Sequence, residues 1–279
     1  MKGFYLNNGV VIPCIGYGTW RLSNEEAEHS VCEALRAGYR LIDTASYYGN
    51  EKGVGEAVRK SCISREEIFV TSKVWNTDRG YDKTKDAFAR TMQNLKLEYL
   101  DLYLIHWPAN YKQFGDHAKE INAGTWCALE ELYSEGRIKS IGLSNFLAHH
   151  IDTLMETAKI KPMVNQIEFH PGWNQEDTID YCHKNSILVQ GWKTLGRNGM
   201  LRNQVLMQIA QKYDKNTAQL CIRWAIQHGI VPLVKSAYTG RIDENIKVFD
   251  FIIDVQDMET IDLLQFLEGQ GILSDEVDY

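Results

Sequence analysis

The chain has 279 residues, a formal net charge of −7 and six cysteines that form no Cys-x-x-Cys pair. The acidic balance argues against nucleic acid or an anionic membrane as the main partner, and scattered thiols are typical of a reducing compartment. No apolar run approaches the roughly 18 residues of a membrane-spanning helix, and the first residues lack the apolar stretch of a signal peptide. We therefore expect a cytoplasmic protein with one domain over residues 1–279, present as a monomer or weak oligomer.

The N-terminal segment predicts a β-hairpin and then a capped helix. Two short apolar runs, 4–6 and 10–12, flank Asn7-Asn8-Gly9, a sequence typical of a hairpin turn. Further on, Ser23 followed by Glu26 forms a capping box, and Gly38 is a stop signal. A helix over residues 24–37 follows from these signals.

Apolar strands then alternate with helical patterns. The strands are continuous apolar runs, as expected when both faces of a parallel sheet are covered. They are expected at 15–18, 40–43, 68–72, 101–106, 138–142, 163–167, 187–190 and 230–234. Helices are expected to begin at Glu51 and near Arg241 and to span 83–97, 126–136, 148–158, 177–185, 203–213 and 217–228.

Eight such units in about 280 residues predict an α/β fold, a (β/α)8 TIM barrel with the hairpin at its N-terminus. The competing arrangement, an open doubly wound sheet, lacks its dinucleotide-binding fingerprint. The run after Gly16 has no third glycine, and Gly53-Val54-Gly55 opens a helix that follows no strand.

Chemistry in such a barrel belongs at the C-terminal ends of the strands. Four polar side chains are expected there: Asp43, Tyr48, Lys73 and His106. A lysine cation favours a phenolate and lowers the tyrosine pKa, while Asp43 can hold that lysine. Such a phenol can protonate a forming alkoxide, and His106 can orient the carbonyl. The reaction that needs these parts is carbonyl reduction, with the hydride supplied by a nicotinamide.

Other strand ends carry groups suited to that cofactor. Ser144, Asn145 and Gln166 can satisfy the donor and acceptor of a carboxamide, and Trp192 offers a flat face for the ring. Further along, at the start of the last barrel helix, Lys235 and Arg241 supply positive charge and Ser236 supplies a hydrogen-bond donor, as a 2′-phosphate would need. No histidines or cysteines share a metal-like spacing, so no metal is assigned.

Each of these residues taken alone also has a structural interpretation. His106 and Trp192 can be core residues, and Lys73 can be only a partner for Asp43. Asn145 and Gln166 can hydrogen-bond loop backbone, and Arg241 can be a solvated helix residue. Their conjunction at the strand ends favours the functional interpretation.

The same residues stand in longer motifs, and through these the chain resembles the aldo-keto reductase family nearly end to end. Within that family it is similar to shorter prokaryotic members related to diketogluconate reductases and to prostaglandin F synthase-like enzymes. The motifs are Gly16-Tyr17-Gly18-Thr19-Trp20, Asp43-Thr44-Ala45-x-x-Tyr48-Gly49-Asn50-Glu51, Lys73-Val74-Trp75, 101–108, 141–146, 165–171 and Arg241-Ile242-x-Glu244-Asn245.

The resemblance implies a catalytic tetrad of Asp43, Tyr48, Lys73 and His106, with Tyr48 rather than Tyr47 as proton donor because it directly precedes Gly-Asn-Glu. It also implies extended NADPH and a small-molecule carbonyl substrate, with the C-terminal tail over the mouth. The expected cofactor contacts are Gly18, Thr19, Trp20, Asp43, Ser144, Asn145, Gln166, Trp192, Lys193, Leu195, Gly196, Lys235, Ser236, Arg241, Glu244 and Asn245. The expected substrate contacts are Trp20, Tyr48, Trp75, His106 and Trp107, with specificity in segments 110–124 and 268–279.

Departures from the family pattern concern the loops around the phosphates. The family usually has an aromatic-Ser-Pro-Leu-Gly run after strand seven, where this chain has Trp192-Lys193-Thr194-Leu195-Gly196. Lys193 can pair with the pyrophosphate or point to solvent. Val234 stands where a proline usually precedes Lys235.

Two other functions remain as alternatives. A Schiff-base aldolase also uses a barrel-strand lysine, which here would be Lys73. A nicotinamide-binding regulatory subunit would need no catalysis, but the complete tetrad argues against it.

Overall fold

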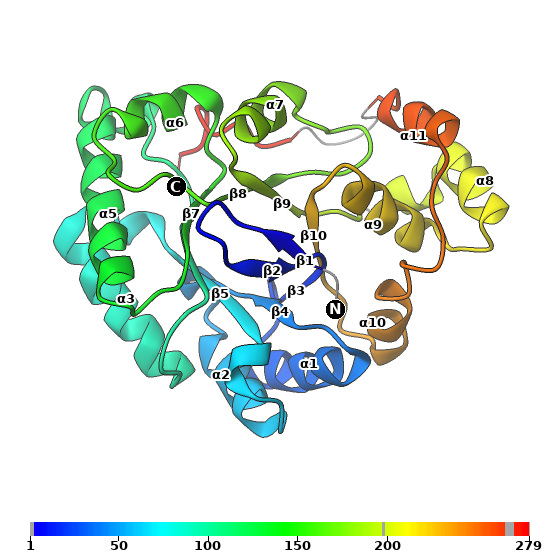
Figure 1. Cartoon of the computed structure of the whole chain (residues 1–279), viewed down its shortest axis with the longest axis horizontal. Helices are drawn as coiled ribbons and strands as arrows, with labels where there is room; N and C mark the ends of the chain where they lie inside the picture. Colours follow the sequence, from blue (N-terminus) through cyan, green and yellow to red (C-terminus); the bar gives the residue numbers. More distant parts are fainter. Residues whose placement is uncertain (1–2, 197–198, 266–270, 279) are drawn as a thin grey trace.

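The computed structural model describes residues 3–196, 199–265 and 271–278. Eight parallel strands form a closed barrel in the order β3-β4-β5-β6-β7-β8-β9-β10, and β10 pairs with β3. Helices surround this barrel (Figure 1). The predicted (β/α)8 barrel is confirmed. The barrel strands are β3 (Gly16–Gly18), β4 (Leu41–Asp43), β5 (Phe69–Val74), β6 (Leu102–Ile105), β7 (Ile141–Ser144), β8 (Val164–Glu168), β9 (Leu188–Trp192) and β10 (Val231–Val234).

The predicted hairpin is present as β1 (Gly3–Tyr5) and β2 (Val11–Pro13), with Gly9 in the left-handed region at φ 85°. Its turn binds the loops that enter the strands: Asn7 donates to Pro162 O and Ser186 O, and Asn8 donates to Lys139 O. The hairpin therefore lies at the N-terminal end of the barrel, opposite the mouth.

The helices follow their sequence signals. In the first of them, Ser23 and Glu26 form the predicted capping box, and Gly38 ends the helix at φ 108°. The helices are α1 (Asn24–Ala37), α2 (Glu51–Lys60), α3 (Tyr81–Leu95), α4 (Tyr111–Phe114), α5 (His117–Ser134), α6 (Ala148–Met155), α7 (Glu176–Lys184), α8 (Gln204–Lys212), α9 (Thr217–Gln227), α10 (Thr239–Asn245) and α11 (Val255–Asp262). Among the helices of residues 3–196, 199–265 and 271–278, none combines the length and the apolar composition of a membrane-spanning helix.

Two glycines in α2 are explained by packing. A Cβ on Gly53 would lie 2.0 Å from Asn24 O, and one on Gly55 would lie 2.0 Å from Leu95 O. Only glycine lets α2 approach α1 and the end of α3 this closely. The Gly-x-Gly pattern therefore serves helix packing.

Three helices differ from the sequence prediction, and one of them is α4, which lies in a segment expected to be loop. Helix α5 begins at His117, nine residues before the predicted Trp126, and α11 was not predicted. Asn122 lies in the early turns of α5 and interrupts their apolar pattern. Its side chain is nevertheless buried, because Ala109 N–H donates to its Oδ1 at 2.8 Å and its Nδ2 donates to Ala109 O at 2.9 Å. The segment 110–124, expected to be loop, is thus largely helical.

Candidate active site

The predicted tetrad meets at the barrel mouth. Asp43 is the last residue of β4, Lys73 lies near the end of β5, and His106 directly follows β6. Tyr48 is carried by a short 3-10 turn, Ser46–Tyr48, just after β4. Because the carboxyl ends of parallel barrel strands share one face, residues far apart in sequence are brought together.

Lys73 forms the centre of this group and is fully buried. Its Nζ lies 2.7 Å from Asp43 Oδ2, 2.9 Å from Thr44 O and 3.2 Å from the Tyr48 hydroxyl. Each ammonium hydrogen therefore has one acceptor, which fixes the ion and aims it at the phenol.

The ionisation states follow from this geometry. Burial would lower the pKa of Lys73, but Asp43 and Tyr48 outweigh it and the pKa is raised, so the amine is charged. Burial raises the pKa of Tyr48, and Lys73 only partly opposes this. The expected net lowering of the tyrosine pKa is therefore wrong for this structure, because removal from water exceeds the attraction of the cation. Tyr48 is a protonated phenol at neutral pH.

His106 is held as a neutral ring. Burial and the nearby Lys73 charge put its pKa well below the usual value. Its backbone C=O accepts from Asn145 Nδ2 at 2.9 Å, and its ring is edge-on to Trp75 at 5.0 Å between centroids. A neutral imidazole carries one N–H that can donate to a substrate oxygen.

Aromatic rings form the rim of the mouth. Tyr47 stacks on Trp75 with 3.7 Å between centroids and on Trp20 at 5.5 Å. Trp20 also lies 4.8 Å from Tyr48. Tyr47 was not predicted as a site residue, although its position beside Tyr48 in an aromatic-rich loop was an available signal. Among the predicted lining residues, Trp20 is exposed, whereas Trp107 is buried.

A second polar network follows β7, β8 and β9 and contains the predicted carboxamide-binding residues. Ser144 Oγ donates to Gln166 O at 2.9 Å, and Trp192 Nε1 donates to Asn145 Oδ1 at 2.8 Å. Gln166 Nε2 donates to Asp43 Oδ1 at 2.9 Å, which joins this network to the tetrad. Gln190, which sequence reasoning missed, accepts from Gln166 at 3.0 Å and is fully buried.

The predicted phosphate-binding residues follow β10. Ser236 is buried and its C=O accepts from Tyr17, whereas Lys235 and Arg241 are exposed. Within residues 3–196, 199–265 and 271–278, neither cation has a carboxylate partner, and the Arg241 guanidinium lies over the Tyr238 ring, 4.9 Å from its centroid. In α10, Glu244 is exposed and Asn245 is buried.

Lys193 does not point to solvent, which was one of its two predicted positions. It pairs with Glu168, a carboxylate that is 1% exposed and also lies 3.3 Å from His170 Nε2. Burial would raise the pKa of Glu168, but His170 and Lys193 together lower it. Leu195 and Gly196 follow in the same loop and are partly buried.

The remaining predicted cofactor contacts, Gly18 and Thr19, lie at the end of β3 and directly after it. Thr19 Oγ1 donates to Asp43 O at 3.0 Å, and Asn50 Nδ2 donates to Thr19 O at 2.8 Å. Gly18 pairs in register with Asp43. These residues therefore fix the backbone beside the tetrad.

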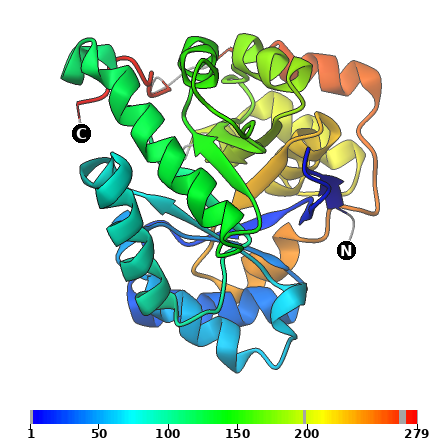
Figure 2. The same cartoon turned by 60° about the vertical axis from the view of Figure 1, so that its left-hand side comes forward.

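The C-terminal tail reaches this same end of the barrel and passes the beginning of α5 (Figure 2). Ser274 Oγ donates to Asn145 O, and Val277 is buried. The tail is thereby attached to the carboxamide network. Of the predicted specificity segment 268–279, residues 268–270 and 279 lie outside the described residues.

Fold and site together are those of a barrel oxidoreductase, and comparison with known proteins gives the family. The sequence model of the aldo/keto reductase family matches residues 14–265. A glyoxal reductase of Bacillus subtilis (strain 168) is 46% identical over 273 residues, covering 98% of this chain and 96% of that protein. A 9,11-endoperoxide prostaglandin H2 reductase of Trypanosoma cruzi (strain CL Brener) is 48% identical, covering 93% of this chain and 90% of that protein.

Solved structures agree with these matches. The aldo-keto reductase MGS-M4, from a Medee basin deep-sea metagenome library, superposes with a TM-score of 0.93 at 45% identity, covering 99% of this chain and all of that one. A variant of Gox0644 in complex with NADPH superposes with a TM-score of 0.92 at 36% identity, covering 100% of this chain and 99% of that one. The chain belongs to the aldo/keto reductase family.

Proposed function

We propose that this chain is an NADPH-dependent oxidoreductase that reduces aldehydes and ketones to alcohols, with Tyr48 as the proton donor. The observation that carries the proposal is the buried Lys73, 3.2 Å from the Tyr48 hydroxyl and 2.7 Å from Asp43 at the barrel mouth. The names of two relatives, a glyoxal reductase and a prostaglandin H2 reductase, and the NADPH complex of Gox0644 support it.

The residues present fit the cofactor. Lys235 and Arg241 are exposed cations without ion pairs in the described part of the chain, as a 2′-phosphate requires. Ser144, Asn145 and Gln166 would hold the carboxamide, and Trp192 would support the ring. NADPH would supply the hydride when bound.

The chain's own residues then have distinct parts in the reaction. His106 donates a hydrogen bond to the carbonyl oxygen and orients it, which its neutral ring allows. Tyr48 gives its proton to that oxygen as negative charge develops there. Lys73 stabilises the resulting phenolate, and Asp43 keeps Lys73 charged and in place.

The rim indicates the class of substrate. Trp20, Tyr47 and Trp75 form a stacked aromatic wall beside His106, which suits flat carbonyl compounds of modest size. We propose small aldehydes, dicarbonyls and keto sugars as the substrates to be examined first.

The aldolase alternative requires a neutral, nucleophilic lysine. Lys73 instead has a raised pKa and is ion-paired with Asp43. The geometry therefore favours an acid-assisting role for Lys73 over Schiff-base formation.

The proposal is tested by following NADPH absorbance with purified protein and a panel of aldehydes, α-diketones, keto sugars and steroids. Tyr48→Phe should lower turnover by roughly 10²–10⁴-fold while NADPH still binds, because only the acid is removed. The matched control is Tyr47→Phe, the neighbouring phenol. A Tyr48→Phe variant that keeps more than about a tenth of wild-type turnover, together with an inactive Tyr47→Phe, would show that the proton donor is misassigned.

A further inference from the structure

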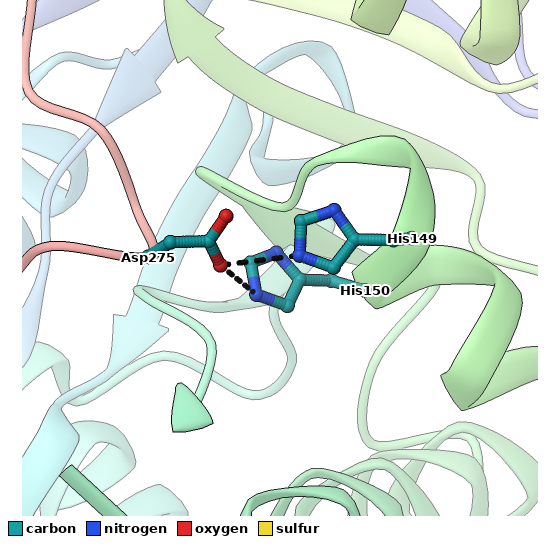
Figure 3. A group of neighbouring side chains, drawn as sticks. All are labelled: His149, His150 and Asp275. Atoms are coloured by element: carbon teal, nitrogen blue, oxygen red, sulfur yellow. Dashed lines mark hydrogen bonds and ion pairs between the residues drawn. The ribbon is translucent and has the colours of Figure 1, made fainter. Parts of the chain in front are cut away.

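Three potential metal ligands meet outside the tetrad. His149 and His150 lie at the beginning of α6, and Asp275 comes from the C-terminal tail (Figure 3). The Nε2 atoms of the two histidines lie 3.1 Å and 3.0 Å from the same oxygen, Asp275 Oδ1. One ligand atom from each residue can be chosen so that all lie within 4.8 Å of one another.

We propose that His149, His150 and Asp275 bind a divalent transition metal of the Zn²⁺ type and that this ion fastens the tail to α6. Two imidazole nitrogens and one carboxylate oxygen are ligands that zinc takes at about 2.0–2.2 Å. In a tetrahedron with such bonds, ligand atoms stand about 3.3 Å apart. The two observed nitrogen–oxygen separations are close to this value, and water would fill the fourth position.

The surroundings favour a cation on balance. A cavity of about 240 Å³ adjoins the cluster and is also lined by Asp116 and Lys119. Asp116 adds negative charge, whereas Lys119 opposes it and is partly neutralised by Glu156 at 3.5 Å.

Binding has one identifiable cost. Leu147 N–H donates to His150 Nδ1 at 3.2 Å, so the ring hydrogen is on Nε2 in the metal-free arrangement. A metal at Nε2 moves this hydrogen to Nδ1, and Leu147 N–H must turn to another acceptor. No proton leaves the protein in this exchange. We therefore expect weaker binding than at a structural zinc site with four protein ligands.

The ion would act on the tail directly. Ser274, the residue before Asp275, donates to Asn145 O, and its own C=O accepts from Asn110 Nδ2 at 2.9 Å. A ligand that binds only the closed arrangement stabilises it by mass action. Metal binding should therefore reduce opening of the tail at the mouth.

The binding test uses the full chain with Cys62→Ser and Cys127→Ser, because these two exposed thiols would also take zinc. The protein is treated with chelator and titrated with Zn²⁺ by calorimetry and with Co²⁺ by absorption. We expect one ion per chain. His149→Ala and Asp275→Asn should each weaken binding at least about tenfold. His183→Ala, which removes another exposed histidine, should bind as the parent does.

Hydrogen exchange of residues 272–278 with and without Zn²⁺ tests the link to the tail. Exchange should slow with zinc in the parent and not in His149→Ala. Equal zinc affinity in the parent, His149→Ala and Asp275→Asn would overturn the site. Unchanged tail exchange in a parent protein that binds zinc would overturn the fastening of the tail. Neither measurement depends on catalysis, so the result is independent of the proposed reductase activity.

Discussion

Asn110 Nδ2 lies 2.9 Å from both Ser274 O and Val277 O, so a single buried amide holds two carbonyls of the C-terminal tail. The same side chain caps α4, because its Oδ1 accepts from Gln113 N at 3.0 Å. The loop after β6 and the tail are therefore one hydrogen-bonded unit at the barrel mouth.

Asn110→Ser should loosen the tail while its hydroxyl still caps α4. Two lost hydrogen bonds, each worth about 1 kcal/mol, should raise the open fraction of the tail by roughly 10–30-fold. Limited proteolysis of the tail measures this, and KM for the carbonyl substrate should rise with it. Lys112→Ala is the control, because Lys112 contacts the same tail only at the surface. Equal proteolysis rates in wild type and Asn110→Ser would contradict the role of the amide.

Lys73→Met should change the pH dependence of carbonyl reduction. The phenol must be protonated to act as an acid, so reduction falls as pH rises through the Tyr48 pKa. Lys73 lowers that pKa, so its removal should move this fall to higher pH and also reduce turnover, because a weaker acid donates less readily. Because burial already raises the Tyr48 pKa, the measurement is the turnover that remains at high pH: the ratio of kcat at about pH 11 to kcat at about pH 7 should be higher in Lys73→Met than in the wild type.

The control for this prediction is the double variant Lys73→Met/Asp43→Asn. Lys73→Met alone leaves Asp43 buried and unpaired, which typically costs about 3–5 kcal/mol of stability. The double variant removes both charges and should fold more stably. Its pH limb should lie above that of the wild type and below that of Lys73→Met, because the Asp43 charge, which raises the Tyr48 pKa, is also absent. Borohydride trapping of a substrate on Lys73 would instead favour the aldolase alternative.

Arg241→Ala should weaken the binding of NADPH and leave the binding of NADH nearly unchanged. Hydrogen bonds to charged groups contribute about 1.5–3 kcal/mol each, so Lys235 and Arg241, discounted for exposure, should give a preference for NADPH of roughly 10–10³-fold. The loss should appear in KM rather than in turnover, because ground state and transition state lose the same contact.

The decisive measurement is kcat/KM for both cofactors. Lys247→Ala is the matched control, since Lys247 is an exposed cation just after α10 that pairs with Asp243. Equal use of NADH and NADPH by the wild type would show that these residues do not recognise a 2′-phosphate.

Lys193→Met should affect stability more than cofactor affinity. Lys193 and His170 hold the pKa of Glu168 below its ordinary value, so this carboxylate contributes stability at pH values above 4.5 that is lost as pH falls through the lower folded value. Without Lys193 this contribution shrinks. Urea unfolding should therefore show a lower free energy at pH 7 and a smaller difference between pH 7 and pH 4.

Fluorescence titration of the same variant with NADPH separates the two positions open to Lys193. If Lys193 stays on Glu168, Kd changes by less than about threefold. A larger increase would mean that Lys193 leaves Glu168 to bind the cofactor pyrophosphate.

Local sequence patterns were enough to predict the barrel and to assign polar side chains to its mouth. Apolar runs bounded by turn signals located all eight strands to within a few residues, because a strand buried on both faces needs such a run. Asp43, Lys73 and His106 could be assigned to one mouth because parallel strands end on the same side. The helix caps at Ser23 and Gly38 are local interactions and were equally readable.

The pairing of polar groups, in contrast, could be read only from the folded chain. Asn110 with the tail and Lys193 with Glu168 are hydrogen bonds or ion pairs between distant positions, and no periodicity marks them. The state of Tyr48 was also undecidable from sequence, since burial and the Lys73 charge act in opposite directions and only the packed geometry sets their balance. The cluster of His149, His150 and Asp275 could not be predicted from the spacing of histidines. Asp275 lies more than a hundred residues away in the sequence and meets the histidines only when the tail folds over the mouth.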